Sequence, residues 1–154
     1  MARVYKRKAR KDYPKDGIKK SDEYYIVSLK TGPRSSLTLR SLKPFRRSQL
    51  TTSEYLSTLY EIEDDLQSFT LVEELSDIVD RWRTLAEETQ EKFDNMPEGL
   101  QQSETGQLLE ERIQSCENAA DELESLLGDW DEDNKTEESE ADLVEQAKQI
   151  SADN

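Results

Sequence analysis

Residues 70–130 read TLVEELSDIVDRWRTLAEETQEKFDNMPEGLQQSETGQLLEERIQSCENAADELESLLGDW, and their pattern decides the fold. Apolar residues recur at steps of three and four from Val72 to Phe93, with one gap at Thr89, and again from Leu109 to Trp130. This spacing places each run along one side of a helix. The proline and glycine within 96–100 interrupt the pattern and favour a turn. The stretch therefore predicts two long helices that bury their apolar sides against each other or against a partner.

Local signals predict where the helices begin and end. A threonine followed three residues later by a glutamate forms a capping box, and this pattern occurs at Thr51 with Glu54 and at Thr70 with Glu73. A glycine commonly follows the last turn of a helix, and we expect Gly128 to do so. The predicted helices span 51–67, 70–95 and 103 or 105 to 128.

Two short segments near the N-terminus are typical of β-strands. Residues 24–29, YYIVSL, are aromatic and β-branched, and residues 36–40, SLTLR, alternate polar with apolar side chains. The sequence TGPR at 31–34 favours a turn between them. The pattern predicts a β-hairpin, which must dock on the helices, pair with another strand or bind a partner, because two strands alone are marginally stable in water.

Together these segments predict a mainly α protein: a long antiparallel helical hairpin plus a shorter helix, with a small N-terminal β-hairpin and flexible tails. Charged residues (36%) outnumber hydrophobic residues (33%), so an elongated helical shape fits better than a large core. The predicted organisation is a basic flexible arm at 1–20, a β-hairpin and basic connector at 21–50, a three-helix domain at 51–128, and an acidic tail at 129–154 with room for a short helix.

Charge is divided between the two ends of the chain. Residues 1–50 carry 15 lysines and arginines and 4 acidic residues, a formal charge of +11, whereas the remaining residues carry −25. Such asymmetry favours an electrostatic partner for at least one of the two parts. The alternative is that the basic arm lies on the acidic helices of its own chain.

The basic N-terminal region has the composition of a nucleic-acid contact. Tyr5 and Tyr13 are interleaved with lysines and arginines, and such mixtures bind phosphates and stack on bases. The alternative is a solvated, disordered arm. The candidate partner-binding residues are Lys6, Arg7, Lys8, Arg10, Lys11, Lys19, Lys20, Arg46 and Arg47.

The long helices carry dense carboxylates on their predicted outer sides. One interpretation is a solvated surface that keeps an elongated helix pair soluble. The other is a rod that mimics the phosphates of DNA and occupies a positively charged groove on a nuclease or polymerase. The candidate partner-binding residues on this acidic face are Glu73, Glu74, Asp77, Asp80, Glu110, Glu111, Glu117 and Asp121.

The composition argues against an enzyme. The chain has no histidine and one cysteine, Cys116, so the usual acid–base group and a zinc-type cluster are missing. It contains no glycine-rich phosphate loop. We therefore expect no catalytic residues, no cofactor and no structural disulfide. No apolar run approaches the length that spans a bilayer, and the N-terminus lacks the apolar stretch of a signal peptide, so no membrane partner is expected.

One spacing resembles a calcium loop but does not amount to a predicted metal site. Positions 1, 3, 5, 7, 9 and 12 of such a loop would be Asp129, Asp131, Asp133, Lys135, Glu137 and Glu140. Position 6 is Asn134 instead of glycine, and position 8 is Thr136 instead of an aliphatic residue. Because the tail is so acidic, a chance match is the simpler interpretation, and calcium binding at 129–140 stays an open alternative.

Several segments resemble small proteins of tailed bacteriophages to which no activity is assigned. The likeness lies in KARKDYP at 8–14, GIKK at 17–20, YY at 24–25, SQLT at 48–51, NMPEGLQQ at 95–102 and TGQLLEER at 105–112. These proteins have a glycine after the paired lysines, where this chain has Ser21. The resemblance implies a phage origin, a location in the host cytoplasm, and the role of an accessory protein that modifies host machinery.

Three functional hypotheses follow. The preferred one is a non-enzymatic phage accessory protein whose acidic helical surface binds and inhibits a host protein, such as a defence complex of the kind that anti-CRISPR proteins block. The second is a nucleic-acid-binding protein that uses the basic N-terminal region. The third is a phage structural or scaffold component, which assembles through its helical hairpins, as a homodimer for example.

Overall fold

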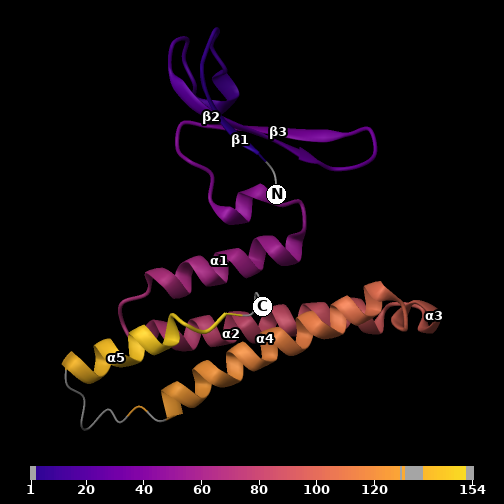
Figure 1. Cartoon of the computed structure of the whole chain (residues 1–154), viewed down its shortest axis with the longest axis vertical. Helices are drawn as coiled ribbons and strands as arrows, with labels where there is room; N and C mark the ends of the chain where they lie inside the picture. The colour runs from indigo at the N-terminus through magenta and orange to yellow at the C-terminus, as the bar shows by residue number, and fades with distance from the viewer. Residues whose placement is uncertain (1–2, 129, 131–136, 152–154) are drawn as a thin grey trace. The chain divides into compact units, whose positions relative to one another are not determined.

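The computed structural model describes residues 3–128, 130 and 137–151 and has the mainly helical fold expected from the sequence, with a small antiparallel sheet near the N-terminus (Figure 1). The chain divides into two compact units, an N-terminal unit at 1–60 and a C-terminal unit at 61–154. Each unit has its own internal contacts, and helix α1 (Glu54–Ser68) begins in the first and ends in the second.

The N-terminal unit is built on three antiparallel strands in the order β1-β2-β3. They are β1 (Val4–Lys8), β2 (Glu23–Lys30) and β3 (Ser36–Ser41). The predicted hairpin is thus present as β2 and β3. The prediction of a flexible arm at 1–20 is wrong for 4–8, which pair with the free edge of β2. Every β1 side chain is exposed, so hydrophobic periodicity carried no signal for this strand.

The segment between β1 and β2 is also ordered. It contains a short 3₁₀ turn, η1 (Pro14–Asp16), and Tyr13 and Ile18 exchange backbone hydrogen bonds of 2.7 and 3.2 Å. Ala9, Ile18 and Tyr24 form a small buried cluster, against which Tyr13 and Ile26 pack. These contacts join residues that are separated in the sequence. They order an arm that its polar composition alone would predict to be flexible.

The first helix begins later than predicted. Residues 47–50 form a 3₁₀ turn, η2 (Arg47–Leu50), and α1 starts at Glu54. The Ser53 hydroxyl accepts a hydrogen bond from the Leu56 backbone N–H at 3.4 Å, while the Thr51 hydroxyl accepts one from the Ser53 N–H at 3.1 Å. Ser53 therefore caps the helix, and Thr51 instead stabilises the turn before it.

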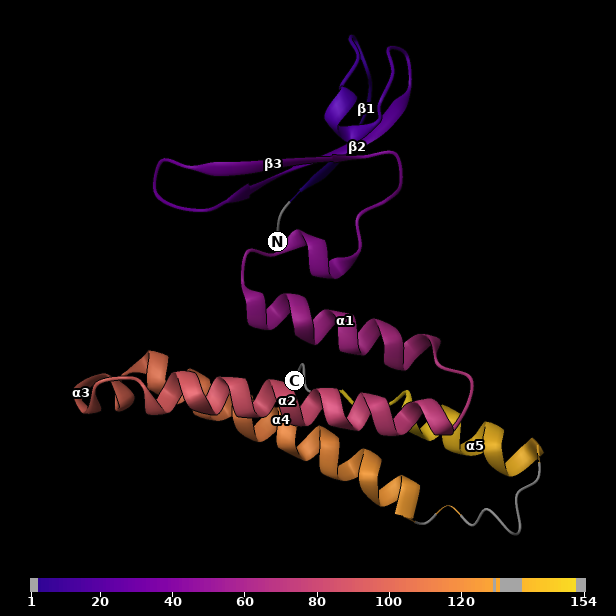
Figure 2. The ribbon, with the colours of Figure 1, turned by 180° about the vertical axis from the view of Figure 1, so that it is seen from behind.

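The C-terminal unit contains the predicted helical hairpin. Helices α2 (Glu73–Asp94) and α4 (Glu104–Gly128) lie side by side and antiparallel in both views (Figures 1 and 2). Trp82 is fully buried. Thr89, the apparent gap in the apolar pattern, is buried because its hydroxyl donates to the Leu85 carbonyl at 2.7 Å. The other buried residues of the two helices are Leu75, Ile78, Val79, Leu85, Ala86, Gly106, Ile113, Cys116, Ala119, Ala120 and Leu123.

The predicted start of α2 at Thr70 is three residues too early. The backbone N–H groups of Thr70 and Leu71 donate to the carboxylate of Glu74, at 3.1 and 3.4 Å. Glu74, and not Glu73, therefore satisfies the amides that precede the helix, so its carboxylate is engaged within the unit.

A tight turn joins the two long helices through a single helical turn, α3 (Glu98–Gln101). Gly106 packs against this turn so closely that a Cβ atom there would lie 1.9 Å from the Gln101 carbonyl oxygen. The Gln101 side chain donates to the carbonyls of Phe93 and Met96 at 3.3 and 3.1 Å. The hairpin can close only because residue 106 has no side chain.

The predicted acidic tail contains helix α5 (Glu137–Ala147). Leu143 and Ala147 are buried. The Gln67 side-chain amide donates to the Lys148 carbonyl at 2.7 Å, and the Ser151 hydroxyl donates to Glu63 at 2.6 Å. Helix α5 therefore packs through Leu143 and Ala147, and the residues that follow it are hydrogen-bonded to α1.

Because the Gln101 backbone approaches Gly106 so closely, adding one methyl group at residue 106 should lower the stability of the protein strongly. Gly106→Ala should lower the free energy of unfolding by about 1–3 kcal/mol, because the Gln101 backbone must move. Gly99→Ala is the matched control, since nothing lies within 4 Å of a Cβ there. Urea unfolding followed by tryptophan fluorescence measures both, and equal stability of the two variants would contradict the tight turn.

The backbone at Ser21 predicts a stabilising substitution. Ser21 has φ +79°, in the left-handed region that favours glycine. Ser21→Gly should raise the free energy of unfolding of the N-terminal unit by about 0.5–1 kcal/mol. Ser21→Ala keeps the strain and should give no gain. Denaturation followed by NMR of the strand amides distinguishes the two, and a gain in both variants would rule out this cause.

Candidate functional site

The division of charge coincides with the division into units. Residues 1–60 carry a formal charge of +10 and residues 61–154 carry −24. Each unit therefore presents a surface of one predominant sign, and a charged ligand approaches them with opposite preferences.

Strand alternation sorts the basic residues onto the two faces of the sheet. Tyr5 lies opposite Ile26, which lies opposite Arg40, while Arg7 lies opposite Tyr24. Partners in register share a face, so these five residues define one side, here called the Tyr5 face. Alternate β1 positions, Lys6 and Lys8 among them, point to the other side, where Lys8 lies opposite Glu23 in register.

A hollow of about 690 Å³ lies at one end of the Tyr5 face. It is here called the cationic groove, and its lining residues are Arg7, Lys8, Ala9, Arg10, Tyr13, Ser21 and Tyr24. Arg7, Lys8 and Arg10 are exposed, and no carboxylate is among the lining residues. The groove therefore combines Arg7 and Arg10 with two aromatic rings and has the composition of an anion site. Lys8 borders it from a strand position whose side chain belongs to the opposite face.

The aromatic wall of the groove is held by neighbouring side chains. Tyr24 is buried, and its ring centroid lies 5.8 Å from that of Tyr13. The Arg40 guanidinium lies 4.7 Å from the centroid of the Tyr13 ring and pairs with Asp16 at 3.6 Å. These contacts place Tyr13 firmly, so the groove is preformed within the N-terminal unit.

The predicted basic residues separate into several environments. Arg7, Lys8 and Arg10 meet at the groove, whereas Lys6 pairs with Glu23 at 2.7 Å. The Arg47 guanidinium lies 3.8 Å from the centroid of the Tyr60 ring. The remaining predicted residues, all exposed, are Lys11, Lys19, Lys20 and Arg46.

The Lys6–Glu23 pair reduces the charge available on its side of the strand. The hydrogen bond from Lys6 lowers the pKa of the Glu23 carboxyl, and the same bond raises the pKa of Lys6. Both side chains are more than half exposed, so the pair adds little stability. Its consequence is local: Lys6 is compensated, and Lys8 lies opposite the same carboxylate in register. Arg7 and Arg10 line the groove with no carboxylate among its lining residues.

Sequence reasoning missed the parts of the groove that come from other strands. Tyr24 and Arg40 were assigned only to strands, and nothing in the local pattern places Arg40 on Tyr13. If residues 4–8 are taken as a strand, alternation places Lys6 and Arg7 on opposite faces of the sheet. This alternation is the sequence signal that could have distinguished the two residues.

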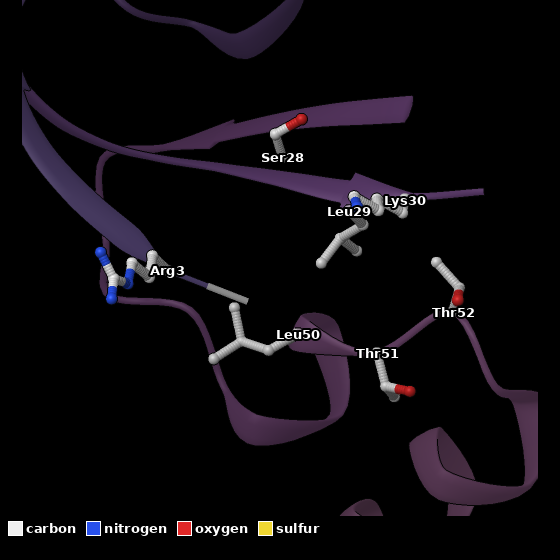
Figure 3. Close-up of a pocket in the computed structure, with 7 residues that line it drawn as sticks. All are labelled: Arg3, Ser28, Leu29, Lys30, Leu50, Thr51 and Thr52. Atoms are coloured by element: carbon white, nitrogen blue, oxygen red, sulfur yellow. The ribbon is translucent and has the colours of Figure 1, made fainter. Parts of the chain in front are cut away.

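A second hollow, of about 470 Å³, lies on the other side of β2 (Figure 3). Figure 3 shows Leu29 and Leu50 projecting into it, whereas Ser28 points away. Its lining residues are Arg3, Ser28, Leu29, Lys30, Leu50, Thr51 and Thr52. Because this set contains no carboxylate, imidazole or thiol, the hollow offers no acid–base pair.

The predicted acidic residues do not share one face. Glu73, Asp77 and Asp80 are exposed on the side of α2 opposite its buried residues, and Glu87 and Glu91 continue this acidic stripe. On α4, Glu110, Glu117 and Asp121 follow a different row of exposed positions, and Glu111 is exposed as well.

The α4 row is partly neutralised. Arg83 of α2 forms an ion pair with Asp121 at 3.2 Å and another with Glu124. A hollow of about 360 Å³ beside this arginine is lined by Arg83, Ala86, Glu87, Gln90, Glu91 and Glu117. The stripe on α2 is thus the more continuous negative surface of the unit.

The residues that the structure describes bear on the metal-binding and membrane-spanning predictions. Within 3–128, 130 and 137–151 no group of three or more Cys, Asp or Glu residues is placed to hold a metal ion. The calcium-loop spacing falls largely on 129 and 131–136, which lie outside the described residues. Among the helices that the structure describes, none has the length and apolarity needed to cross a membrane.

Comparisons with protein-family models, curated proteins and solved structures find no match.

The Lys6–Glu23 contact predicts a titration shift. Glu23 should titrate below its ordinary value of 4.5, and Lys6→Ala should return its pKa toward that value, as carboxyl NMR would measure. Because the folded pKa is the lower one, the stability from this pair is present above pH 4.5 and is lost as the pH falls through the folded pKa. Arg7→Ala, on the opposite face, should leave Glu23 unchanged. An unshifted Glu23 in the wild type would contradict the contact.

Proposed function

We propose that the protein is a non-enzymatic nucleic-acid-binding protein and that the cationic groove is its phosphate-binding site. The observation that carries this proposal is that Arg7 and Arg10 line one hollow that has no carboxylate among its lining residues. Arginine and lysine supply most phosphate contacts in nucleic-acid complexes. A groove in a unit of formal charge +10 attracts a polyanion from a distance as well as at contact.

The groove differs from a set of solvated cations because its wall is fixed. Tyr24 is buried, and Tyr13 is held between Tyr24 and Arg40. A preformed site loses less conformational entropy when a ligand binds. Arg40 acts here as a positioning residue, since it lies on Tyr13 and pairs with Asp16.

The acidic C-terminal unit fits this function as a selectivity element. Its charge of −24 repels a polyanion, so binding is directed to the N-terminal unit and non-specific association along a nucleic acid is reduced. The balance should depend on salt, because screening weakens both the attraction and the repulsion.

A second candidate function uses the acidic stripe. Glu73, Asp77, Asp80, Glu87 and Glu91 recur along one side of α2, and Arg83, the cation that borders this stripe near Glu87 and Glu91, is paired with Asp121 and Glu124 of α4. Such a row fits a cationic groove on another protein, as an inhibitor of a host nuclease or defence complex would require. A chain that binds neither DNA nor RNA but is retained by an immobilised lysine-rich polypeptide would favour this candidate.

The proposed function predicts a matched pair of charge variants. Arg7→Gln with Arg10→Gln should weaken binding of labelled DNA or RNA by about tenfold or more, and should reduce the slope of log K against log salt by about 1.5–2. Lys6→Gln with Arg34→Gln removes the same charge outside the groove and should change affinity by about twofold or less. Fluorescence anisotropy measures both variants.

The two double variants distinguish binding by the groove from a general effect of net charge. Equal losses in the two double variants would mean that net charge, and not the groove, binds the nucleic acid. A wild-type chain that binds no DNA or RNA at low salt would overturn the proposal.

A further inference from the structure

An exposed aromatic ring beside the groove indicates which kind of nucleic acid the protein binds. We infer that the ligand is single-stranded and that one of its bases stacks on Tyr5. This inference rests on the proposed function, since it assumes that the phosphates bind in the cationic groove.

Tyr5 is half exposed, at 50% of its maximum, on the edge strand β1. It lies two residues from Arg7 on the same side of the strand, and the Arg7 guanidinium is 5.7 Å from the centroid of its ring. Its partner in the sheet, Ile26, is half-buried and packs against the small cluster around Tyr24. The ring is therefore presented to solvent beside an apolar neighbour and a cation.

Arg7 joins the aromatic ring to the groove. Its side chain lines the cationic groove and also lies near the Tyr5 ring. A phosphate bound by Arg7 therefore places the attached sugar and base next to Tyr5. The two contacts suit one continuous strand, with its backbone in the groove and a base on the ring.

The other tyrosines of the groove are not available for stacking. Tyr24 is buried, and Tyr13 is half-buried between Tyr24 and Arg40. Among the aromatic side chains that the structure describes, Tyr5 is the one that is exposed. A base that enters this region would therefore stack on Tyr5.

Stacking on Tyr5 selects against a duplex. In a double helix the faces of the bases are covered by their neighbours, and only their edges and the backbone are accessible. Single strands expose base faces, which stack on aromatic side chains with little regard to sequence. The exposed ring of Tyr5 therefore favours a single strand over a duplex.

The test uses the full-length protein and compares its affinity for single-stranded and double-stranded nucleic acids. Fluorescence anisotropy with labelled dT12, rU12 and a 12-base-pair DNA duplex should show binding of a single strand about tenfold or more tighter than the duplex at equal salt. The dT12 and rU12 arms identify which kind of strand is preferred, and tight binding of either supports the inference.

Three variants test the ring itself. Tyr5→Leu keeps apolar area but removes the aromatic face, and should weaken single-strand binding by about tenfold, whereas Tyr5→Phe should bind within about twofold of wild type. Leu37→Ala, an exposed apolar residue on the other face of the sheet, is the matched control and should have no effect. Photocrosslinking of a 5-bromouracil strand in place of dT12 should map to Tyr5, which reports contact independently of any change in stability.

Failure of this inference differs from failure of the proposed function. If the duplex binds as tightly as dT12 and rU12, or if Tyr5→Leu changes nothing while Arg7→Gln with Arg10→Gln still weakens binding, the groove binds phosphate and the stacking inference is wrong. If no nucleic acid binds at all, the proposed function itself is wrong.

Discussion

The backbone ladder between β1 and β2 holds the candidate site together. It sets Arg7 opposite Tyr24 and Tyr5 opposite Ile26, and through this register it decides which cations share a face with the aromatic rings. A slip by one residue would move Lys6 to that face and Arg7 away from it. The strand has little burial of its own, so its register depends on the ladder and on the small cluster of Ala9, Ile18 and Tyr24 that closes the following loop.

The C-terminal unit follows a different physical rule. Its two long helices bury a continuous seam around Trp82, and this leaves their carboxylates on the outer surface. The buried indole N–H of Trp82 has no hydrogen-bond partner among the described residues, so it opposes part of the stability that burying the ring provides. The seam needs close backbone contact at the turn, which Gly106 permits. Because burial uses the apolar side, the acidic stripe is a direct consequence of amphipathic folding.

The two units combine opposite fields in one chain. A positive unit with a preformed groove and a negative unit with a continuous stripe present different surfaces to the same solution. Long-range forces sort ligands by sign before any contact is made, and screening limits their reach to about 10 Å at moderate salt. Specificity must then come from local geometry, which in the N-terminal unit is the placement of Tyr13 by Arg40 and Tyr24.

The sequence by itself determined the helical hairpin, the β2–β3 hairpin and the separation of charge, because periodicity and composition are local properties of the chain. The tertiary structure alone decided that 4–8 form a strand, that Ser53 and Glu74 satisfy the amides at the helix starts, and that Lys6 is compensated while Arg7 lines the groove. The strand and the sorting of the cations depend on partners distant in sequence, such as Tyr24 opposite Arg7. The capping groups lie only three or four residues from the amides they satisfy, but neighbouring residues offered the same local pattern. A strand with no apolar alternation carries no local record of the strand that pairs with it.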